Sequence, residues 1–398
     1  MKKLLLLGGA SYLLPVIREA QAMGIHVITC DYLPDNIAHK YSDEYRDVSI
    51  IDKDAVLEAA KELRIDGIMS FACDPGVTTA AYVAEKLSLP FAGSYESVCI
   101  LQNKARFRDF LREHGFNVPW SYSFRSVAEA VENADKLAYP AIVKPVDSAG
   151  SKGVSRIDSA SELPSAVECA LSYSFSDTVI VEEFLEKEGA SSDTDSFSVD
   201  GVLRYASFDD QLFDAAADNP YTPAAYCWPS SMPDWAQKEL RGELQRLITL
   251  LELKTSVYNI ETRLCKNGKT YIMEMSPRGG GNRLCEVLYR ASGVNLIRNA
   301  VRAAVSLPVE EMSDPVYDGC WAELILHAEK AGRFRALRID PAVEKCVVER
   351  DLWINEGDEV EGFTGANKAV GTLVLHFDDR ETLDKTMSKT DWVKLIVD

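Results

Sequence analysis

The chain has 398 residues, too many for a single hydrophobic core, and its 46% hydrophobic and 26% charged residues are those of an ordinary globular protein. We therefore expect two or three domains. The formal net charge of −19 argues against a nucleic-acid-binding surface, because phosphate contacts need clustered Lys and Arg. Nine single cysteines without a CxxC motif predict reduced thiols in a cytoplasmic protein, and five separated histidines argue against a zinc site.

The first residues are expected to form a strand and not a targeting segment. The apolar run that starts at Leu4 ends after four leucines at Gly8, which is shorter than the apolar core of a signal peptide. No segment approaches the roughly 20 apolar residues of a membrane span. The sequence therefore predicts a protein that has neither a membrane nor a nucleic acid as its partner.

Strands and helices alternate over residues 1–95. Strands are expected at 4–7, 26–30 and 67–71, and helices at 11–23, 53–64 and 75–87. This succession predicts a mostly parallel sheet with right-handed crossovers. The fingerprint G-x-G-x-x-G is absent after the first strand, which argues against an NAD-dependent dehydrogenase. Asp74 follows a strand, where such sheets bind ligands, but capping of the next helix is the favoured interpretation.

Two lysines and a loop of small residues follow. Asn103 is expected to cap a helix over 103–114, and Lys104 then lies in its first turn, where the helix dipole disfavours a cation. Lys144 lies in an apolar strand over 141–146. The segment 147–153 (DSAGSKG) joins this strand to the next, and it is either a plain hairpin end or a loop whose backbone N–H groups close over phosphates. It is not a Walker A loop, because no helix follows it.

The middle and the end of the chain give weaker signals. A strand over 178–181 runs into Glu182-Glu183-Phe184-Leu185, and the aromatic, proline-containing residues 209–233 are expected to form a long substrate-side loop. Helical sequence covers 235–251 and 284–305. From about residue 313 strands dominate, at 322–327, 346–350, 359–363, 370–376 and 393–397, with a short helix near 381–388.

The segment 257–276 predicts a β-hairpin that brings acidic residues face to face. Asn-Gly is the strongest short hairpin signal, and a two-residue turn at Asn267-Gly268 places Glu261 opposite Glu274 and Asn259 opposite Ser276. Opposed side chains lie on one face with Cβ atoms roughly 4.5–5.5 Å apart, so the glutamates repel each other unless a cation lies between them. Mg²⁺ binds through one or two carboxylates plus substrate phosphates. Two solvated glutamates on an exposed face are the alternative.

The second strand of the hairpin continues into Ser-Pro-Arg-Gly-Gly-Gly-Asn-Arg, whose two guanidinium groups beside a metal site indicate anion chemistry. The ordered set of lysines, small-residue loop, Val-Glu-Glu-Phe-Leu and paired glutamates resembles the ATP-grasp superfamily of carboxylate–amine ligases over about residues 1–310. Within the superfamily the chain resembles L-amino acid ligases and members similar to carbamoyl-phosphate synthetase or phosphoribosylglycinamide synthetase. The C-terminal region looks like the trailing domain of the first two of these groups.

This resemblance implies a combination of α/β and α+β domains. An N-terminal Rossmann-like (pre-ATP-grasp) domain would cover 1–96, and an ATP-grasp domain of two α+β subdomains would cover 97–312. Of these subdomains, 97–177 would carry the lid over the phosphates and 178–312 the metal and substrate sites. A small, mostly β C-terminal domain would cover 313–398.

The resemblance also implies roles for individual residues. Those expected to bind ATP are Lys104, Lys144, Ser148, Gly150, Ser151, Gly153, Glu182, Glu183, Phe184, Leu185 and, for the ribose, Glu188. The expected metal ligands are Glu261, Glu274 and Ser276, where the superfamily commonly has Asn. Arg278 and Lys152 are the expected catalytic residues, and the expected substrate contacts are Gly280, Asn282 and Arg283, the last either as a clamp for a carboxylate or as a surface arginine at a helix start.

The implied reaction joins a small carboxylate, an amino acid by preference, to an amine through an acyl phosphate, and it releases ADP and phosphate. ATP and Mg²⁺, with Mn²⁺ as a substitute, would be the cofactors, and a homodimer is the expected assembly. Three alternatives stay open: an enzyme similar to phosphoribosylamine–glycine ligase or a carbamoyl-phosphate-type carboxylating enzyme, an NAD-dependent dehydrogenase, and a catalytically silent nucleotide-binding module.

Overall fold

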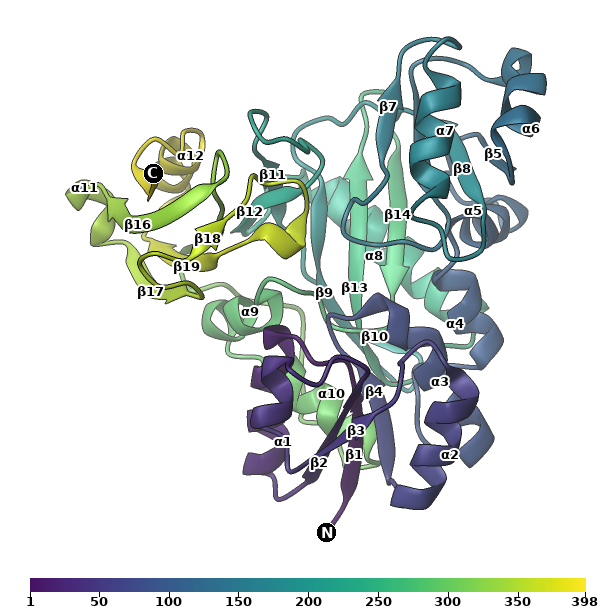
Figure 1. The fold of residues 1–398 in the computed structure, drawn as a ribbon, viewed down its shortest axis with the longest axis vertical. Helices are drawn as coiled ribbons and strands as arrows, with labels where there is room; N and C mark the ends of the chain where they lie inside the picture. The colour runs from purple at the N-terminus through teal and green to yellow at the C-terminus, as the bar shows by residue number, and fades with distance from the viewer.

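The computed structural model describes all 398 residues, and its first region is a parallel sheet with the strand order β3-β2-β1-β4 (Figure 1). The strands pair in parallel, as the βαβ pattern predicts. The strands are β1 (Lys3–Leu7), β2 (His26–Asp31), β3 (Glu44–Asp47) and β4 (Gly67–Ser70). The helices are α1 (Leu14–Ala22), α2 (Lys53–Leu63), α3 (Val77–Leu87) and α4 (Tyr95–Leu101), with 3₁₀ turns η1 (Ser11–Leu13), η2 (Ile37–Lys40) and η3 (Asp74–Gly76).

The second region is an antiparallel sheet with the order β5-β8-β6-β7, and it carries the small-residue loop between β6 and β7. Its strands are β5 (Ser121–Phe124), β6 (Ala141–Pro145), β7 (Ser155–Ile157) and β8 (Val179–Glu183). Its helices are α5 (Lys104–Glu113), α6 (Val127–Glu132) and α7 (Leu163–Leu171), with the turn η4 (Ala134–Lys136). Asn103 caps α5 as predicted, because its side chain accepts hydrogen bonds of 3.1 Å from the N–H groups of Ala105 and Arg106.

The third region is a sheet with the order β10-β9-β13-β14. It consists of β9 (Ser192–Val199), β10 (Val202–Tyr205), β13 (Ser256–Leu264) and β14 (Thr270–Ser276). One face is buried against α8 (Asp234–Leu250) through Leu244 and Leu247 of the helix and Tyr258, Ile260 and Met275 of the strands. Because side chains alternate along a strand, the residues between these apolar ones face the opposite side of the sheet.

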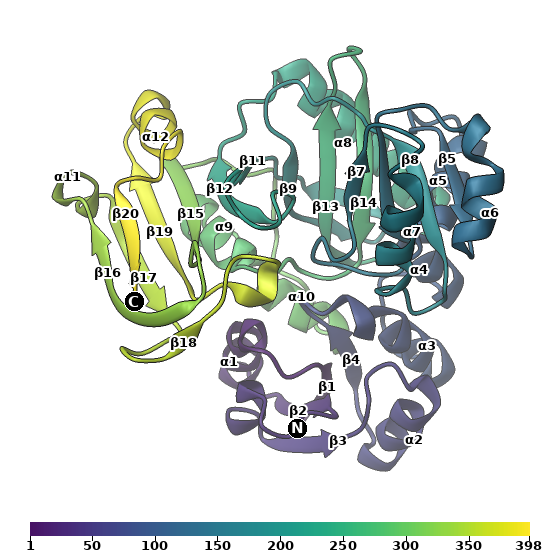
Figure 2. The same cartoon turned by 45° about the horizontal axis from the view of Figure 1, so that its top comes forward.

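Two helices follow β14 where one helical segment was predicted, because Gly293 ends α9 (Leu284–Ser292) in a left-handed conformation before α10 (Leu296–Ala304) begins. α10 packs against α1 and β4, so the end of the middle region is seated on the N-terminal sheet (Figure 2). The fit is close at Gly67, where a Cβ would lie 2.1 Å from the carbonyl oxygen of Ala304.

The C-terminal region contains a sheet with the order β11-β12-β15-β19-β17 and a smaller sheet β18-β16-β20. Its strands after residue 313 are β15 (Cys320–Leu326), β16 (Gly332–Ile339), β17 (Val347–Leu352), β18 (Glu359–Val360), β19 (Gly371–Phe377) and β20 (Val393–Val397). They are accompanied by α11 (Pro341–Glu344), α12 (Arg380–Met387) and the turn η5 (Ala366–Lys368).

The prediction of one long loop over 209–233 was wrong. Residues 210–228 form the strands β11 (Asp210–Phe213) and β12 (Pro223–Trp228), and β12 pairs with β15. The aromatic residues of this stretch, such as Trp228, are buried because they pack in the core. Only residues 214–222 connect the two strands as a loop.

We keep the domain boundaries 1–96, 97–312 and 313–398 as a proposal. Strand pairing crosses the subdomain boundary after residue 177 and the domain boundary after residue 312. β8 (residues 179–183) belongs to the sheet β5-β8-β6-β7, and β11 and β12 belong to the C-terminal sheet. None of the helices has both the length and the apolar composition needed to cross a bilayer.

Candidate active site

The acidic pair of the hairpin is opposed as predicted, although the turn is not. Glu261 pairs with Glu274 and Asn259 with Ser276. The turn has three residues and not two, because the N–H of Cys265 donates to the carbonyl of Lys269 over 3.0 Å. A β-bulge between Glu261 and the turn shifts the register by one residue and restores the predicted pairs. The additional turn residue and the bulge each shift the register by one residue in opposite directions, so the predicted pairs form.

A third carboxylate extends this pair to the neighbouring strand β9. Asp193 lies opposite Glu261, and Asp195 lies opposite Asn259. Asp193, Glu261 and Glu274 therefore form one row across β9, β13 and β14, which we call the acidic row. Burial, and then the charge of Glu261, raise the pKa of Asp193 well above its ordinary value, while Gln211 donates a hydrogen bond of 3.0 Å to its carboxylate.

Two cations contact the acidic row, one at its middle member and one at its β14 end. Arg263 lies 2.8 Å from Glu261, and the ammonium of Lys104 lies 3.5 Å from Glu274. Lys104 also donates to the carbonyl oxygen of Ser148 over 2.9 Å, so it joins the row to the small-residue loop. This position explains why a cation occupies the first turn of α5, because its partner lies on another element.

The donor set of the acidic row fits Mg²⁺ when phosphates complete the coordination. No three Asp, Glu, His or Cys side chains of the chain converge closely enough to enclose a metal ion. The row offers a few carboxylate oxygens side by side on adjacent strands. This number is sufficient for Mg²⁺, which uses one or two carboxylates when it binds together with substrate phosphates. Ser276, the third predicted ligand, is 1% exposed, and its hydroxyl donates to Asp74 and accepts from Gln102.

Lys144 of β6 and Glu182 of β8 lie on adjacent strands of the sheet β5-β8-β6-β7 and form a buried ion pair. Arg108 of α5 completes this cluster, because its Nε lies 3.0 Å from the second oxygen of Glu182 and its Nη1 donates to the carbonyl of Met273 over 2.8 Å. Burial favours a raised pKa for Glu182, but Arg108 and Lys144 outweigh it and lower the pKa to about 2. For Lys144 burial dominates, and its pKa is lowered.

The segment after Glu182 contains a buried residue, Leu185, whose backbone donor is free. The N–H of Glu183 donates to Trp120 and that of Phe184 to Pro140. The N–H of Leu185 donates to no protein acceptor, although its side chain is buried. Glu188, in contrast, is exposed, and its N–H is bound to the carbonyl of Leu264.

The small-residue loop is bent by three left-handed residues: Gly150 at φ +70°, Ser151 at +58° and Gly153 at +67°. Gly153 is tightly enclosed, since a Cβ would lie 2.9 Å from the ring of Tyr173. Lys152 lies between these residues, is exposed and makes no ion pair. Its ammonium is therefore available to an anion.

Arg278 is held by a residue of the N-terminal sheet. Its Nε and Nη2 donate to the two oxygens of Asp74 over 3.0 and 2.8 Å. The prediction that Asp74 caps a helix was wrong: its carboxylate binds Arg278 and Ser276 and no helix N–H. Burial favours a raised pKa for Asp74, but Arg278 outweighs it and lowers the pKa.

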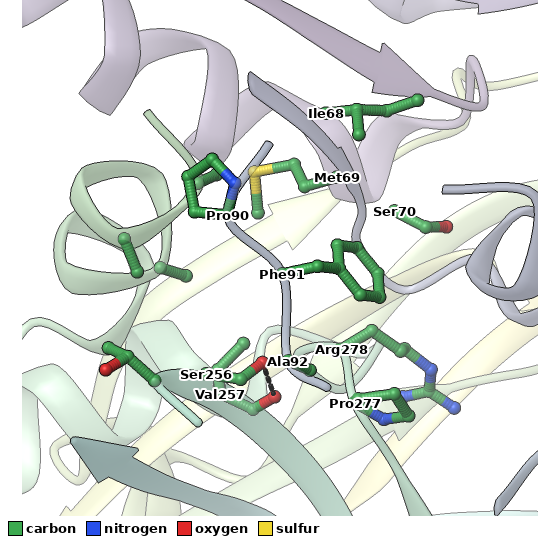
Figure 3. A pocket seen from close by; sticks show the side chains of 14 residues that line it. Ile68, Met69, Ser70, Pro90, Phe91, Ala92, Ser256, Val257, Pro277 and Arg278 are labelled. Carbon is green, nitrogen blue, oxygen red and sulfur yellow. Dashed lines mark hydrogen bonds between the residues drawn. The ribbon is translucent and has the colours of Figure 1, made fainter. Parts of the chain in front are cut away.

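A small cavity of about 40 Å³ lies behind Arg278, between β4, the segment 90–92 and the start of β13 (Figure 3). Its walls include Met69, Pro90 and Phe91, and the guanidinium points away from Met69 and Pro90. A nucleotide does not fit such a volume, which is closer to that of a water molecule. The cavity is therefore a packing gap and not the reaction site.

The three predicted substrate residues lie beside the same sheet. The N–H of Gly280 donates to Asp195 over 2.8 Å, and Asn282 accepts a hydrogen bond of 3.3 Å from Tyr12. Arg283 is ion-paired with Glu286 at 3.1 Å and Glu349 at 2.7 Å, so protein carboxylates already occupy much of its guanidinium.

Three functional candidates escaped the sequence analysis: Asp193, Arg108 and the partnership of Asp74 with Arg278. The alternation of Asp193 and Asp195 in a Ser- and Thr-rich run is the one local signal that indicates a strand with an acidic face. Arg108 follows Lys104 by one helical turn, which places both on one face of α5, but no signal in the sequence names their partners.

Known proteins resemble this chain in sequence, in part or along its whole length, and in fold. Residues 115–294 match the family model described as D-ala D-ala ligase C-terminus. Formate-dependent phosphoribosylglycinamide formyltransferase from Bacteroides thetaiotaomicron is 26% identical over 409 aligned positions, covering 98% of this chain and 97% of the relative. The structure of L-amino acid ligase from Bacillus licheniformis has a TM-score of 0.81 at 19% identity, with 100% of this chain and 99% of that chain covered.

The chain has the ATP-grasp fold, and its residues 115–294 match a ligase family with that fold.

ATP-grasp members are ATP-dependent ligases or carboxylases, and this chain is accordingly an ATP-dependent enzyme of the ligase type that uses ATP and Mg²⁺. The biotin carboxylase domain of 2-oxoglutarate carboxylase from Hydrogenobacter thermophilus has the same fold, with a TM-score of 0.75 at 16% identity over 100% of this chain and 91% of that chain. That structure was determined with MgADP and bicarbonate bound.

Proposed function

We propose that this ATP-grasp enzyme forms an amide bond between a small carboxylate, an amino acid in the first instance, and an amine. The observation that supports this most is the acidic row beside Lys104, because it combines hard oxygen ligands with a cation next to the lid. Lys104 and Lys144 would neutralise ATP phosphates, and the free N–H of Leu185 would bind the adenine base. Glu261 and Glu274, with Ser276 or Asp193 beside them, would hold Mg²⁺, which offsets phosphate charge when bound.

In the proposed first step, an oxygen of the substrate carboxylate attacks the γ-phosphorus of ATP. The bond from that phosphorus to the β–γ bridging oxygen breaks, ADP leaves and an acyl phosphate forms. In the second step the amine nitrogen attacks the acyl carbon, phosphate leaves and the nitrogen loses a proton. The protein contributes position and charge neutralisation. Arg278, oriented by Asp74, would stabilise the transferred group, and Lys152 of the lid would add a further cation.

A substrate carboxylate would bind Arg283 in competition with Glu286 and Glu349, which make ion pairs with it. Gly280 and Asn282 would line the substrate site beside it; both are buried, and they are held by hydrogen bonds to Asp195 and from Tyr12.

A second candidate transfers the acyl group to an amine that carries a phosphoribosyl group. It is favoured by the B. thetaiotaomicron relative, which matches along the whole chain, and by phosphoribosylglycinamide synthetase from Anaerococcus prevotii, with a TM-score of 0.75 at 20% identity and 100% coverage of both chains. A homodimer and a cytoplasmic location remain predictions.

Hydroxylamine tests the proposal, because it converts an acyl phosphate into a stable hydroxamate. The enzyme is incubated with ATP, Mg²⁺ and each of the amino acids, with and without hydroxylamine, and ADP and hydroxamate are measured. The proposal expects carboxylate-dependent ADP release with one hydroxamate per ADP. ADP release that needs a phosphoribosylamine would favour the second candidate, and ATP turnover that never yields hydroxamate with any carboxylate would contradict both.

A further inference from the structure

The loop between β11 and β12, residues 214–222, contacts the small-residue loop 147–153, which is the proposed lid over the phosphates. We call residues 214–222 the latch loop. The hydroxyl of Ser151 in the lid donates to the carbonyl of Tyr221 over 2.9 Å. In return, the side-chain amide of Asn219 donates to the carbonyl of Ser151 over 3.2 Å. The lid is therefore held by two hydrogen bonds from one loop, at a residue whose left-handed backbone is unusual for a serine.

Asn219 also connects the lid to the C-terminal region. Its side-chain nitrogen donates a second hydrogen bond, of 3.3 Å, to the carbonyl of Thr364, and its backbone N–H donates to Phe363 over 3.3 Å. Its side-chain oxygen accepts from the N–H of Tyr221 over 3.1 Å. Both the donor and the acceptor ends of one amide are thus used, and only Asn or Gln offers this combination.

The C-terminal sheet fixes the position of the latch loop. Asp214 accepts from the N–H of Ala216 over 2.8 Å, and its other oxygen lies 3.1 Å from Nε2 of His327. The ring of His327 stacks on Phe363 with centroids 4.0 Å apart. The loop is therefore attached to the residue that follows β15 and to the segment 362–368.

The lid and the C-terminal segment do not pack against each other broadly. A groove of about 670 Å³ lies between them, and the residues that line it include Lys152, Gly153, Asn219, Tyr221, Thr364, Gly365, Asn367 and Lys368. Because the groove is open, the few hydrogen bonds of Asn219 and Ser151 carry the connection. The other hydrogen bonds of the lid run to its own region, from Lys104 to Ser148 and from Ser174 and Phe175 to Asp147.

We propose that Asn219 is a positioning residue that latches the phosphate lid to the C-terminal region. Lid opening, and with it release of ADP, then requires loss of the hydrogen bonds that join Ser151 to Asn219 and Tyr221, while the bond from Asn219 to Thr364 holds the latch loop on the C-terminal region. The inference rests on the proposed function only in that the lid is taken to cover the phosphates of ATP. The contact itself can be tested without nucleotide.

Three variants separate the latch from general stability. Asn219→Ala removes the amide, and Asn219→Asp keeps its volume and acceptor but loses both donors. Asn367→Ala is the matched control, because Asn367 lines the same groove and makes no hydrogen bond. Thermal unfolding of each variant is recorded first. If Asn219→Ala unfolds more than a few degrees below the wild type, the comparison uses Asn219→Asp, which is the smaller change.

Two measurements report on the lid. Trypsin cleavage after the exposed Lys152, identified by mass spectrometry, measures how often the lid detaches without nucleotide. Stopped-flow release of a fluorescent ADP analogue measures opening in the complex. We expect both rates to rise several-fold in both Asn219 variants and to match the wild type in Asn367→Ala.

Unchanged cleavage after Lys152 in Asn219→Asp would overturn the latch. Faster cleavage with unchanged release of the ADP analogue would overturn its role in product release. Failure of the proposed function has a different signature, since it appears as missing hydroxamate in the wild type and leaves nucleotide-free cleavage unaffected.

Discussion

Replacement of Glu182 by glutamine should destabilise the enzyme markedly, because Glu182 is 2% exposed and is the common partner of Lys144 and Arg108. Its pKa falls from the ordinary 4.5 to about 2. At about 1.4 kcal/mol for each pKa unit, this corresponds to about 3 kcal/mol of favourable interaction with the carboxylate. The loss of one partner from a buried ion pair costs about 3–5 kcal/mol, which agrees with this figure.

The same shift predicts how the effect depends on pH. A carboxylate whose folded pKa lies below its unfolded pKa contributes its full stabilisation above the unfolded value. The stabilisation is then lost as pH falls through the folded value. The difference in stability between the wild type and Glu182→Gln should therefore be constant from pH 7 to about 5 and should shrink from about pH 4.5 toward pH 2.

Urea unfolding at pH 7, followed by tryptophan fluorescence, and melting curves between pH 7 and 3 measure these quantities. Glu183→Gln is the matched control, because Glu183 is the next residue on the strand and makes no ion pair. Destabilisation of Glu182→Gln by less than about 1 kcal/mol at pH 7, or a difference that does not shrink at pH 3, would refute the assignment of Glu182 as the charge partner of both cations.

Three further predictions concern the acidic row and the segment that follows β14. Glu274→Gln should lower Mg²⁺-dependent ADP formation by roughly 10²-fold, since a metal ligand is lost, and a higher Mg²⁺ requirement in the same assay would show that the metal is affected. Arg278→Lys should lower kcat by a similar factor, because lysine lacks the two-pronged geometry that the aspartate binds, and unchanged kcat would contradict the role of Arg278. Gly279→Ala should destabilise the fold by about 1–3 kcal/mol, because its Cβ would lie 2.2 Å from the ring of Phe71. Gly281→Ala is its control in thermal unfolding, since its Cβ would meet only ordinary contacts.

Local sequence determined the features that depend on one short segment. The Asn-Gly signal and the alternation of residues along β13 and β14 predict the hairpin that carries Glu261 and Glu274, although the exact pair also needs the bulge. Asn103 sets the start of α5 and so places Lys104 in its first turn. In both cases the element itself follows from residues within about 14 positions of one another, so propensity and periodicity are sufficient to predict it.

Tertiary structure alone decided which of these faces meet. Periodicity assigns Asp193 and Glu261 to strand faces, but their pairing joins residues 68 positions apart, and no local rule selects the partner strand. The bulge that corrects the hairpin register lies where Arg108 binds the carbonyl of Met273, a contact between α5 and β14. Asp74 likewise takes its role from Arg278, 204 positions away. A sequence pattern specifies a face and a charge, whereas the free energy of burying that charge depends on partners that only the folded chain supplies.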